Sequence, residues 1–167
     1  MYLDDIKLNT EIHIPEAVID KERMLEFARL YDPIPLHCDE EYAKTTKFGR
    51  LIAPGVMSFM AVWARFTEND IFGEELIAGK STKIEWFKPV FAGDVLTGKA
   101  RISAITRRNP YNGIAELTID VFNQHGELVY FLVQPTNISV LSESNIALKI
   151  QHLMQLLSVQ PDIEIIC

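Results

Sequence analysis

The chain has 167 residues, of which 48% are apolar and 23% are charged, and its net charge is −7. This length predicts one domain that can bury its own core, and the composition excludes a disordered, collagenous or coiled-coil protein. The acidic balance, without a large cluster of Lys or Arg, provides no basic face to displace counterions from phosphates. A nucleic acid is therefore not an expected partner.

Cysteine usage and the hydrophobic pattern indicate an intracellular protein. Cys38 and Cys167 are the two cysteines, and a bridge would join the last residue to an internal loop. We therefore expect reduced thiols and a cytoplasmic location. The first ten residues, MYLDDIKLNT, contain two acids and no apolar core, unlike a signal peptide. The longest uncharged stretch, 128–142, is interrupted by polar residues and Pro135, so no membrane span is expected.

Two short helices are predicted early in the chain. The first begins after Asp20, a good capping residue. Its apolar face carries Met24, Phe27, Ala28 and Tyr31. Asp39 can cap the second helix, which has acids in its first turn and lysines at its end. Pro33 and Pro35 disfavour helix between them, so residues 31–37 are expected to form an ordered, extended loop.

A third predicted helix, 56–66, follows the turn Pro54-Gly55 and is apolar almost all round. Its apolar residues are Val56, Met57, Phe59, Met60, Ala61, Val62, Trp63, Ala64 and Phe66. Such a helix must be surrounded by other elements rather than laid on a surface.

The second half of the chain is predicted to be mainly strand. Segments with strand character lie at 82–86, 95–105, 114–122 and 128–141, separated by turns rich in Gly and Asn. In the third segment Leu117, Ile119 and Val121 alternate with polar residues and define a buried face. Four consecutive strands favour an antiparallel meander. An antiparallel sheet curled around one buried helix is the hot-dog arrangement, an α+β fold.

The composition changes near residue 142, so we expect one domain over residues 1–142 and a C-terminal helical extension over 143–167. The predicted helix of this extension spans 144–157. Its apolar residues are Ile146, Leu148, Ile150, Leu153, Met154 and Leu157.

Asp32 and His37 are candidate catalytic residues, because they lie five residues apart in a segment stiffened by two prolines. A carboxylate and a neutral imidazole around one water form a general acid–base pair. In the alternative, structural interpretation Asp32 caps a turn and His37 packs against the next helix. Spacing alone leaves both open.

Gly55 begins the apolar helix, so its N–H is an unpaired donor at the positive end of the helix dipole. Such a donor can polarise a carbonyl group, and the missing Cβ lets a ligand approach the backbone. The alternative is a plain loop-to-helix turn, with Ser58 as a first-turn residue that faces the core.

The run D-P-I-P-L-H-C-D-E-E-Y-A (32–43) and the later F-G-R-L-I-A-P-G-V-M-S (48–58) resemble the MaoC-like dehydratase family, which includes the (R)-specific enoyl-CoA hydratases. Two further segments, W-F-K-P-V-F-A-G-D (86–94) and N-Q-H-G-E (123–127), resemble motifs of the same family. The resemblance covers most of the chain. It implies a hot-dog hydratase or dehydratase that acts on an acyl thioester.

Carried over by position, the resemblance makes Asp32 and His37 the pair that activates water for addition to C3 of a trans-2-enoyl thioester. The reverse reaction dehydrates a 3-hydroxyacyl thioester. Gly55 N–H then binds the thioester carbonyl, and Ser58 lines the site. No metal or other cofactor is implied, since coenzyme A or an acyl carrier belongs to the substrate. A homodimer or a higher homo-oligomer is also implied, with the acyl group entering near the subunit boundary.

Two positions depart from the family pattern. Many hydratases have Asn where this chain has Ile34, and some have His or Ser where it has Pro54. The acyl chain length and the direction of the reaction therefore stay open. The alternative functions are a hot-dog thioesterase and a non-catalytic acyl-CoA binding protein, although a binding protein needs no intact Asp–His pair.

Other polar residues give weaker signals. His13, His125 and His152 are isolated, without metal-ligand spacing, and are expected at the surface or in packing. Arg107 and Arg108 lie at a predicted hairpin tip, where they could meet coenzyme A phosphates. A solvated turn is the simpler interpretation.

Overall fold

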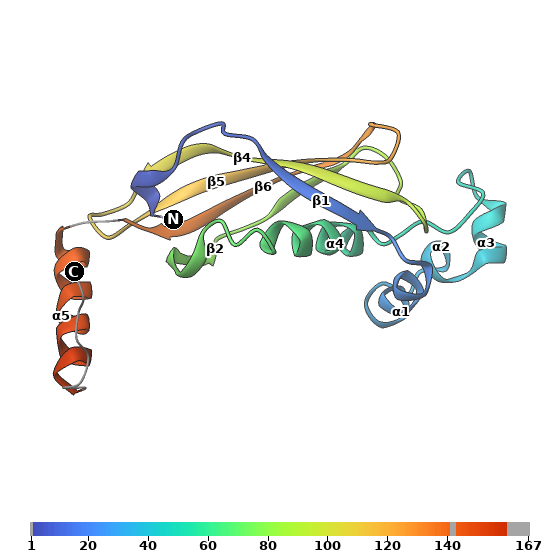
Figure 1. Ribbon diagram of the computed structural model, residues 1–167. Helices are drawn as coiled ribbons and strands as arrows, with labels where there is room; N and C mark the ends of the chain where they lie inside the picture. The colour runs from blue at the N-terminus through green and yellow to red at the C-terminus, as the bar shows by residue number, and fades with distance from the viewer. Residues whose placement is uncertain (1, 141–142, 160–167) are drawn as a thin grey trace.

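The computed structural model describes residues 2–140 and 143–159, and its described strands form one antiparallel sheet (Figure 1). The strands are β1 (Ile12–Val18), β2 (Leu76–Gly79), β3 (Lys83–Trp86), β4 (Val95–Arg107), β5 (Asn112–Phe122) and β6 (Leu128–Ser139). Their order is β1-β4-β5-β6-β2, and β3 also pairs with β6.

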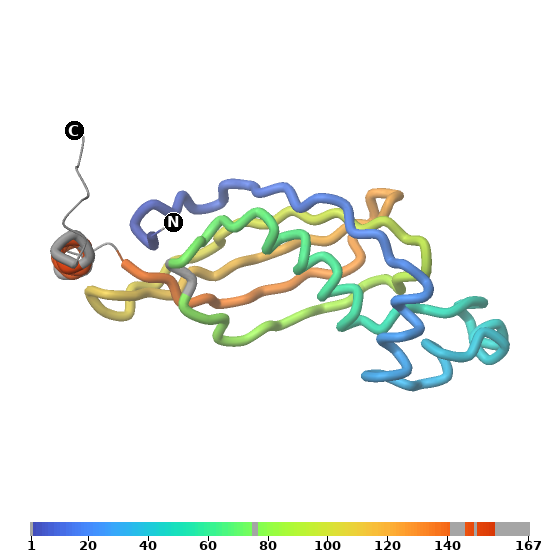
Figure 2. Tube along the Cα trace, turned by 60° about the horizontal axis from the view of Figure 1, so that its bottom comes forward, coloured from blue at the N-terminus to red at the C-terminus, as the bar shows by residue number. Residues whose placement is uncertain are grey.

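The helices lie mainly along one face and at one end of this sheet. They are α1 (Lys21–Tyr31), α2 (Pro35–Cys38), α3 (Glu40–Thr45), α4 (Gly55–Thr67), α5 (Glu143–Val159) and the 3-10 turns η1 (Leu3–Asp5) and η2 (Gly73–Glu75). The long helix α4 runs along the face of the sheet, and α1, α2 and α3 cluster beyond one end of it (Figures 1 and 2).

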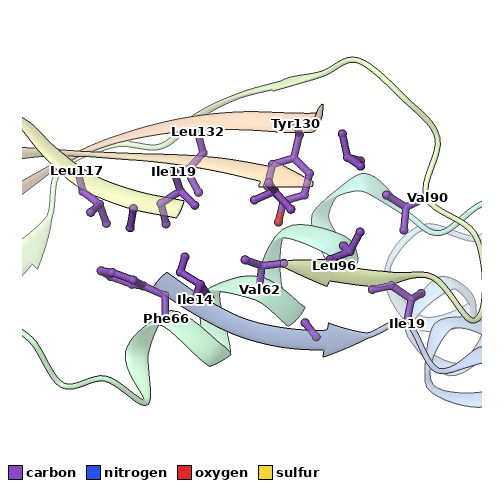
Figure 3. Packing of buried hydrophobic residues seen from close by; sticks show 14 of the residues in the cluster. Ile14, Ile19, Val62, Phe66, Val90, Leu96, Leu117, Ile119, Tyr130 and Leu132 are labelled. Carbon is purple, nitrogen blue, oxygen red and sulfur yellow. The ribbon is translucent and has the colours of Figure 1, made fainter. Parts of the chain in front are cut away.

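The core lies between α4 and the sheet (Figure 3). Val62 and Phe66 of α4 are buried against side chains that the strands direct toward the helix. Those strand residues include Ile14, Leu96, Leu117, Ile119 and Leu132. The predicted alternation of β5 is confirmed, because its residues 117, 119 and 121 are fully buried. A curled antiparallel sheet packed on a central helix confirms the predicted hot-dog fold.

The prediction that α4 is surrounded on all sides is wrong for the single chain, which leaves one flank of the helix exposed. Val56 is 54% exposed and Met60 is 48% exposed, and Ala64 and Thr67 continue the same exposed stripe. Spacings of four, four and three residues place these side chains on one flank of the helix. The stripe carries no charged side chain.

The predicted four-strand meander is correct only for β4, β5 and β6. Strand β3 pairs with β6, with Lys83 opposite Val133, and not with its neighbour β4. Strands β1 and β2 were not predicted. In β1 the register shifts between Ile14 and Ala17, and Pro15 breaks the alternation, which a strand tolerates at a sheet edge or a bulge.

The expected extended loop over residues 31–37 is instead partly helical, because α2 begins at Pro35. Proline fits the first position of a helix, where its fixed φ suits the turn and no N–H is needed. The predicted caps are confirmed. Asp20 accepts a hydrogen bond from Arg23 N at 2.9 Å, and Asp39 accepts one from Tyr42 N at 3.0 Å.

Helix α5 confirms the predicted C-terminal helix and extends it by one residue at the start and two at the end. Its described apolar side chains are exposed, namely Ile146, Leu148, Ile150, Leu153 and Met154. The side chain of Leu157 and all of Cys167 lie outside the described residues. The domain boundary predicted at residue 142 stays a prediction. No helix in the described part of the chain is long and apolar enough to cross a bilayer.

Candidate active site

The structure brings Asp32 and His37 together at one end of the sheet. Asp32 caps the C-terminus of α1, where its N–H donates to Ala28 O at 2.9 Å, and its side chain is 42% exposed. His37 lies in α2 and is buried. Its Nε2 atom is 3.3 Å from Oδ2 of Asp32. The short helix α2 thus turns the imidazole toward the end of α1.

The second ring nitrogen of His37 fixes the tautomer of the neutral imidazole. Nδ1 lies 2.7 Å from the carbonyl oxygen of Ile52, and because a carbonyl can only accept, Nδ1 must carry the hydrogen. Nε2 is then an acceptor in the neutral ring, and it faces a carboxylate that also only accepts. One water molecule can donate one proton to each of these two atoms. With the neutral imidazole, the pair can therefore bind one water molecule through both acceptor atoms.

The N-terminus of α4 leaves its backbone donors uncapped. Pro54 is the N-cap residue and makes no side-chain hydrogen bond, and Gly55 N–H has no acceptor among the described residues. A Cβ at Gly55 would lie 2.8 Å from Cε2 of Trp86. A side chain at this position would therefore force the indole ring or the helix turn to move. The free N–H also lies at the positive end of the helix dipole.

Ser58 and Tyr130 hold the first turn of α4 against the sheet. Ser58 is fully buried, and its Oγ donates to Gly55 O at 2.7 Å. Tyr130 lies in β6, and its buried hydroxyl donates a hydrogen bond of 3.2 Å to Ser58 O. Burial raises the pKa of Tyr130 well above its ordinary value, so the hydroxyl stays protonated and keeps donating.

A cavity of about 600 Å³ joins these groups. Asp32, His37, Gly55 and Ser58, the four candidate site residues, all line it. Most of the remaining wall is apolar, formed by Phe48, Ile52, Ala53, Val56, Trp86, Phe87, Pro89 and Val90. An apolar pocket with a few convergent polar groups is the usual form of a small-molecule site. Such a pocket can hold an apolar chain whose polar end meets the Asp–His pair.

Comparisons with known proteins place the chain in a family. Residues 6–120 match the MaoC-like domain. The chain belongs to the MaoC-like domain family. Over 95 residues it is 32% identical to the (R)-specific enoyl-CoA hydratase of Aeromonas caviae, across 56% of this chain and 66% of the hydratase.

Two solved structures share the fold of this MaoC-like protein. One is a monoamine oxidase regulatory protein from Archaeoglobus fulgidus, with a TM-score of 0.79, 26% identity, and coverage of 84% of this chain and 95% of that chain. The other is a MaoC-like dehydratase from Rhodospirillum rubrum, with a TM-score of 0.69, 26% identity, and coverage of 84% and 97%.

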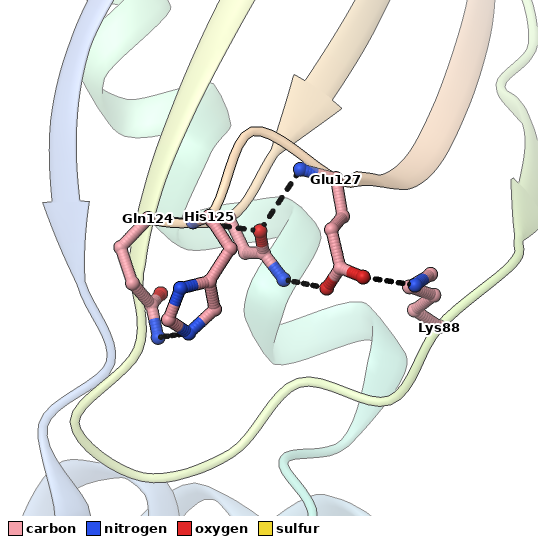
Figure 4. Close-up of polar contacts among 5 residues, drawn as sticks. Lys88, Gln124, His125 and Glu127 are labelled. Atoms are coloured by element: carbon pink, nitrogen blue, oxygen red, sulfur yellow. Dashed lines mark hydrogen bonds and ion pairs between the residues drawn. The ribbon is translucent and has the colours of Figure 1, made fainter.

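The segments 86–94 and 123–127, which resemble two family motifs, contact each other in the MaoC-like chain (Figure 4). Gln124 Nε2 in the β5–β6 hairpin donates to Oδ1 of the buried Asp94 at 3.0 Å, and Lys88 pairs with Glu127. The first of these segments also contacts the residues that precede α4, because Ala53 N donates a hydrogen bond of 2.7 Å to Val90 O. The hairpin thus supports one wall of the cavity.

Sequence reasoning missed some residues of the cavity. Lys47, Lys88 and the Trp86 ring line it. Trp86 and Lys88 belong to the segment 86–94 that resembles a family motif, but that resemblance assigned them no role in the site, and nothing in the local sequence marks Lys47. Ile34 and Pro54, the two departures from the family pattern, are not among the lining residues.

The remaining candidates lie outside the cavity. Arg107 pairs with Asp4, and neither it nor Arg108 lines the cavity. His13, His125 and His152 are exposed, as predicted. Within residues 2–140 and 143–159, no three His, Cys, Asp or Glu side chains gather so that they could hold a metal ion.

Proposed function

We propose that this MaoC-like protein is an acyl-thioester hydratase or dehydratase. It adds water across the C2–C3 double bond of a trans-2-enoyl-CoA, or removes water from the corresponding 3-hydroxyacyl-CoA. The observation that carries the proposal is the pair of acceptor atoms, Asp32 Oδ2 and His37 Nε2, 3.3 Å apart in the same cavity as Gly55. The similarity to an (R)-specific enoyl-CoA hydratase supports it.

The proposed reaction begins with a water molecule that donates one proton to Asp32 Oδ2 and the other to His37 Nε2. The water oxygen attacks C3, while the C2–C3 π electrons move toward the thioester carbonyl. The Asp–His pair accepts one proton from the water and returns one proton to C2. The product gains OH at C3 and H at C2, which together are one water molecule, so no oxidant or reductant is needed. General acid–base steps of this kind typically contribute about 10²–10⁴-fold each.

Gly55 N–H is the proposed donor to the thioester carbonyl oxygen. Negative charge develops on that oxygen as the water attacks, and a fixed N–H at a helix N-terminus stabilises it most in the transition state. Loss of one such donor typically costs about 10²–10³ in kcat. Ser58 and Tyr130 keep the donor in place through the hydrogen bonds of the first turn.

The proposed reaction needs no oxidant or reductant and its acid–base chemistry comes from the Asp–His pair, so we expect no metal or redox cofactor; coenzyme A belongs to the substrate. The apolar wall of the cavity suits an acyl group. Lys47 adds positive charge to the wall, which suits the phosphates of coenzyme A or of an acyl-carrier phosphopantetheine, whereas Lys88 is already paired with Glu127.

The proposed partner is a second copy of the chain. The exposed, uncharged stripe of α4 begins at Val56, which also lines the cavity, so a subunit packed on this stripe would complete the mouth of the site. Light scattering should give the mass of a dimer. Replacing Met60 by Glu should shift that mass toward the monomer, and a monomeric wild type would exclude this arrangement.

An assay across trans-2-enoyl-CoAs of several chain lengths tests the proposed reaction. We expect loss of the enoyl thioester absorbance and formation of an (R)-3-hydroxyacyl-CoA, with no free thiol released. Release of thiol with the alkene intact would show a thioesterase instead. Tight binding of every acyl-CoA without turnover of any would show a binding protein.

A further inference from the structure

A second cavity, of about 200 Å³, lies at the C-terminal end of α4. It shares no described lining residue with the cavity that contains Asp32 and His37. Aromatic rings form much of its wall. The Trp63 and Phe66 ring centroids are 5.3 Å apart, and those of Phe66 and Phe72 are 6.4 Å apart. Strand β6 contributes two polar side chains, Gln134 and Thr136.

The Gln134 amide is buried and held in one orientation. The residue is only 9% exposed, and its Oε1 accepts a hydrogen bond from Thr82 Oγ1 at 2.8 Å. The NH₂ end therefore points the other way, toward Gly79, where an added Cβ would lie 3.0 Å from Nε2. The absence of a side chain at Gly79 leaves room for the amide.

The Gln134 NH₂ group has no acceptor among the described residues. Among the described residues Asn112 Oδ1 is the buried side-chain atom without a hydrogen-bond partner, so Gln134 Nε2 keeps some contact with the open space of the cavity. Gln134 lines the cavity, and its donor is therefore available to an acceptor that enters the cavity and replaces water there.

The other lining residues define the chemistry of the occupant. The aromatic rings suit an apolar body, and Asp70 at the wall disfavours a negative charge. An engineered apolar cavity of about 150 Å³ binds benzene, so about 200 Å³ suits one six-membered ring with a small substituent. We propose that this cavity binds an apolar group of about that size through a neutral carbonyl or hydroxyl oxygen that accepts from Gln134 Nε2.

Such a group could come from two sources. The first is the far end of a long acyl chain, since Gly55 and Phe66 are eleven residues apart on α4, about 16 Å along its axis. The second is a free small molecule. The first source rests on the proposed function, and the second is independent of it.

The probe for the cavity itself is cyclohexanone, with methylenecyclohexane as a control of the same shape that lacks the oxygen. Titration into the ¹⁵N-labelled protein, followed by NMR, should shift the side-chain amide signals of Gln134. The hydrocarbon should bind about tenfold more weakly, because it forms no hydrogen bond. Gln134→Leu should weaken cyclohexanone binding to a similar extent, and Asp32→Asn should leave it unchanged.

Gly79→Ala is a second variant, in which the new methyl group displaces the amide and should also weaken binding of the ketone. Equal binding of the two probes, unchanged binding to Gln134→Leu, or no binding of either probe would overturn the proposal. In the last case the cavity holds water only.

The two sources are separated by a pair of trans-2-enoyl-CoAs of equal length, one with a keto group near the far end of the chain. A higher kcat/KM for the keto substrate that disappears in Gln134→Leu assigns the cavity to the acyl chain. Binding of cyclohexanone without this preference assigns it to a free molecule. Binding of cyclohexanone without turnover of any enoyl-CoA means that the proposed function fails while the cavity proposal stands.

Discussion

His37 Nδ1 lies 2.7 Å from the carbonyl oxygen of Ile52, three residues before the start of α4 at Gly55. This hydrogen bond connects the imidazole in α2 to the turn that carries the uncapped backbone donors. The Asp–His pair and Gly55 N–H are therefore positioned relative to each other, although they come from separate segments. A reaction that needs both groups at one substrate depends on this connection.

Replacing His37 by Asn separates the two functions of the imidazole. The Asn amide can still donate to Ile52 O, but it provides no base where Nε2 was. We expect kcat to fall about 10²–10⁴-fold with little change in thermal stability. His37→Ala should lose activity to a similar degree. His125→Asn, at an exposed hairpin position, is the matched control and should retain wild-type activity. Near-normal kcat in His37→Asn would show that Nε2 is not required.

Gly55→Ala should damage the site through Trp86. The new Cβ would lie 2.8 Å from the indole ring, so either the ring or the first turn of α4 must move. We expect a lower kcat/KM, and a smaller loss when Trp86→Ala makes room in the double variant. A double-mutant cycle measures this coupling. Strictly additive effects would mean that the contact does not restrain the turn.

Tyr130→Phe should lower stability at pH 7 by about 0.5–1.5 kcal/mol, because it removes the donor to Ser58 O without changing shape. Burial raises the pKa of Tyr130 in the folded protein, so the unfolded chain loses this proton first, near pH 10. The stability linked to Tyr130 is present below about pH 10 and is lost above it, by up to about 1.4 kcal/mol per pH unit.

The Tyr130→Phe variant has no hydroxyl to ionise at this position and does not lose this stability. The difference in free energy of unfolding between the wild type and the variant should therefore become smaller at high pH. Urea unfolding of both proteins at pH 7 and pH 10.5 measures the two gaps. A gap that widens at pH 10.5 would contradict the buried, protonated hydroxyl.

Gln124→Ala should destabilise the protein by about 1–3 kcal/mol, because the buried Asp94 carboxylate loses a partner. Glu127→Gln in the same hairpin breaks the exposed pair with Lys88 and should cost less than about 1 kcal/mol. Thermal or urea unfolding compares the two variants. Equal effects would show that the hairpin does not support the segment containing Asp94.

The sequence predicted the fold well where the signal was local. The caps at Asp20 and Asp39, the buried face of β5 and the apolar helix α4 all follow from nearby residues. Strand β1 was missed because Pro15 and a bulge break its alternation. Helix α2 is not predicted because proline disfavours a helix interior, whereas Pro35 stands at the first helical position, where proline is favourable.

The candidate site was predicted in part, because the spacing and the family resemblance both pointed to Asp32, His37 and Gly55. The contacts that orient these residues were not predictable. His37 meets Ile52 fifteen residues away, and Gly55 meets Trp86 on another segment. Contacts of this kind depend on tertiary packing, which leaves no periodic signal in the sequence. The same holds for the cavity beside Gln134.

The most direct test of the account is hydration of trans-2-enoyl-CoA by wild type, Asp32→Asn and Asp39→Asn. Asp32→Asn keeps the shape of the side chain but removes its charge and basicity, so turnover should fall by at least about 10²-fold while acyl-CoA binding and folding persist. Asp39→Asn should behave like wild type, because Asn caps a helix as well as Asp. Undiminished turnover in Asp32→Asn would contradict the proposed water-activating pair.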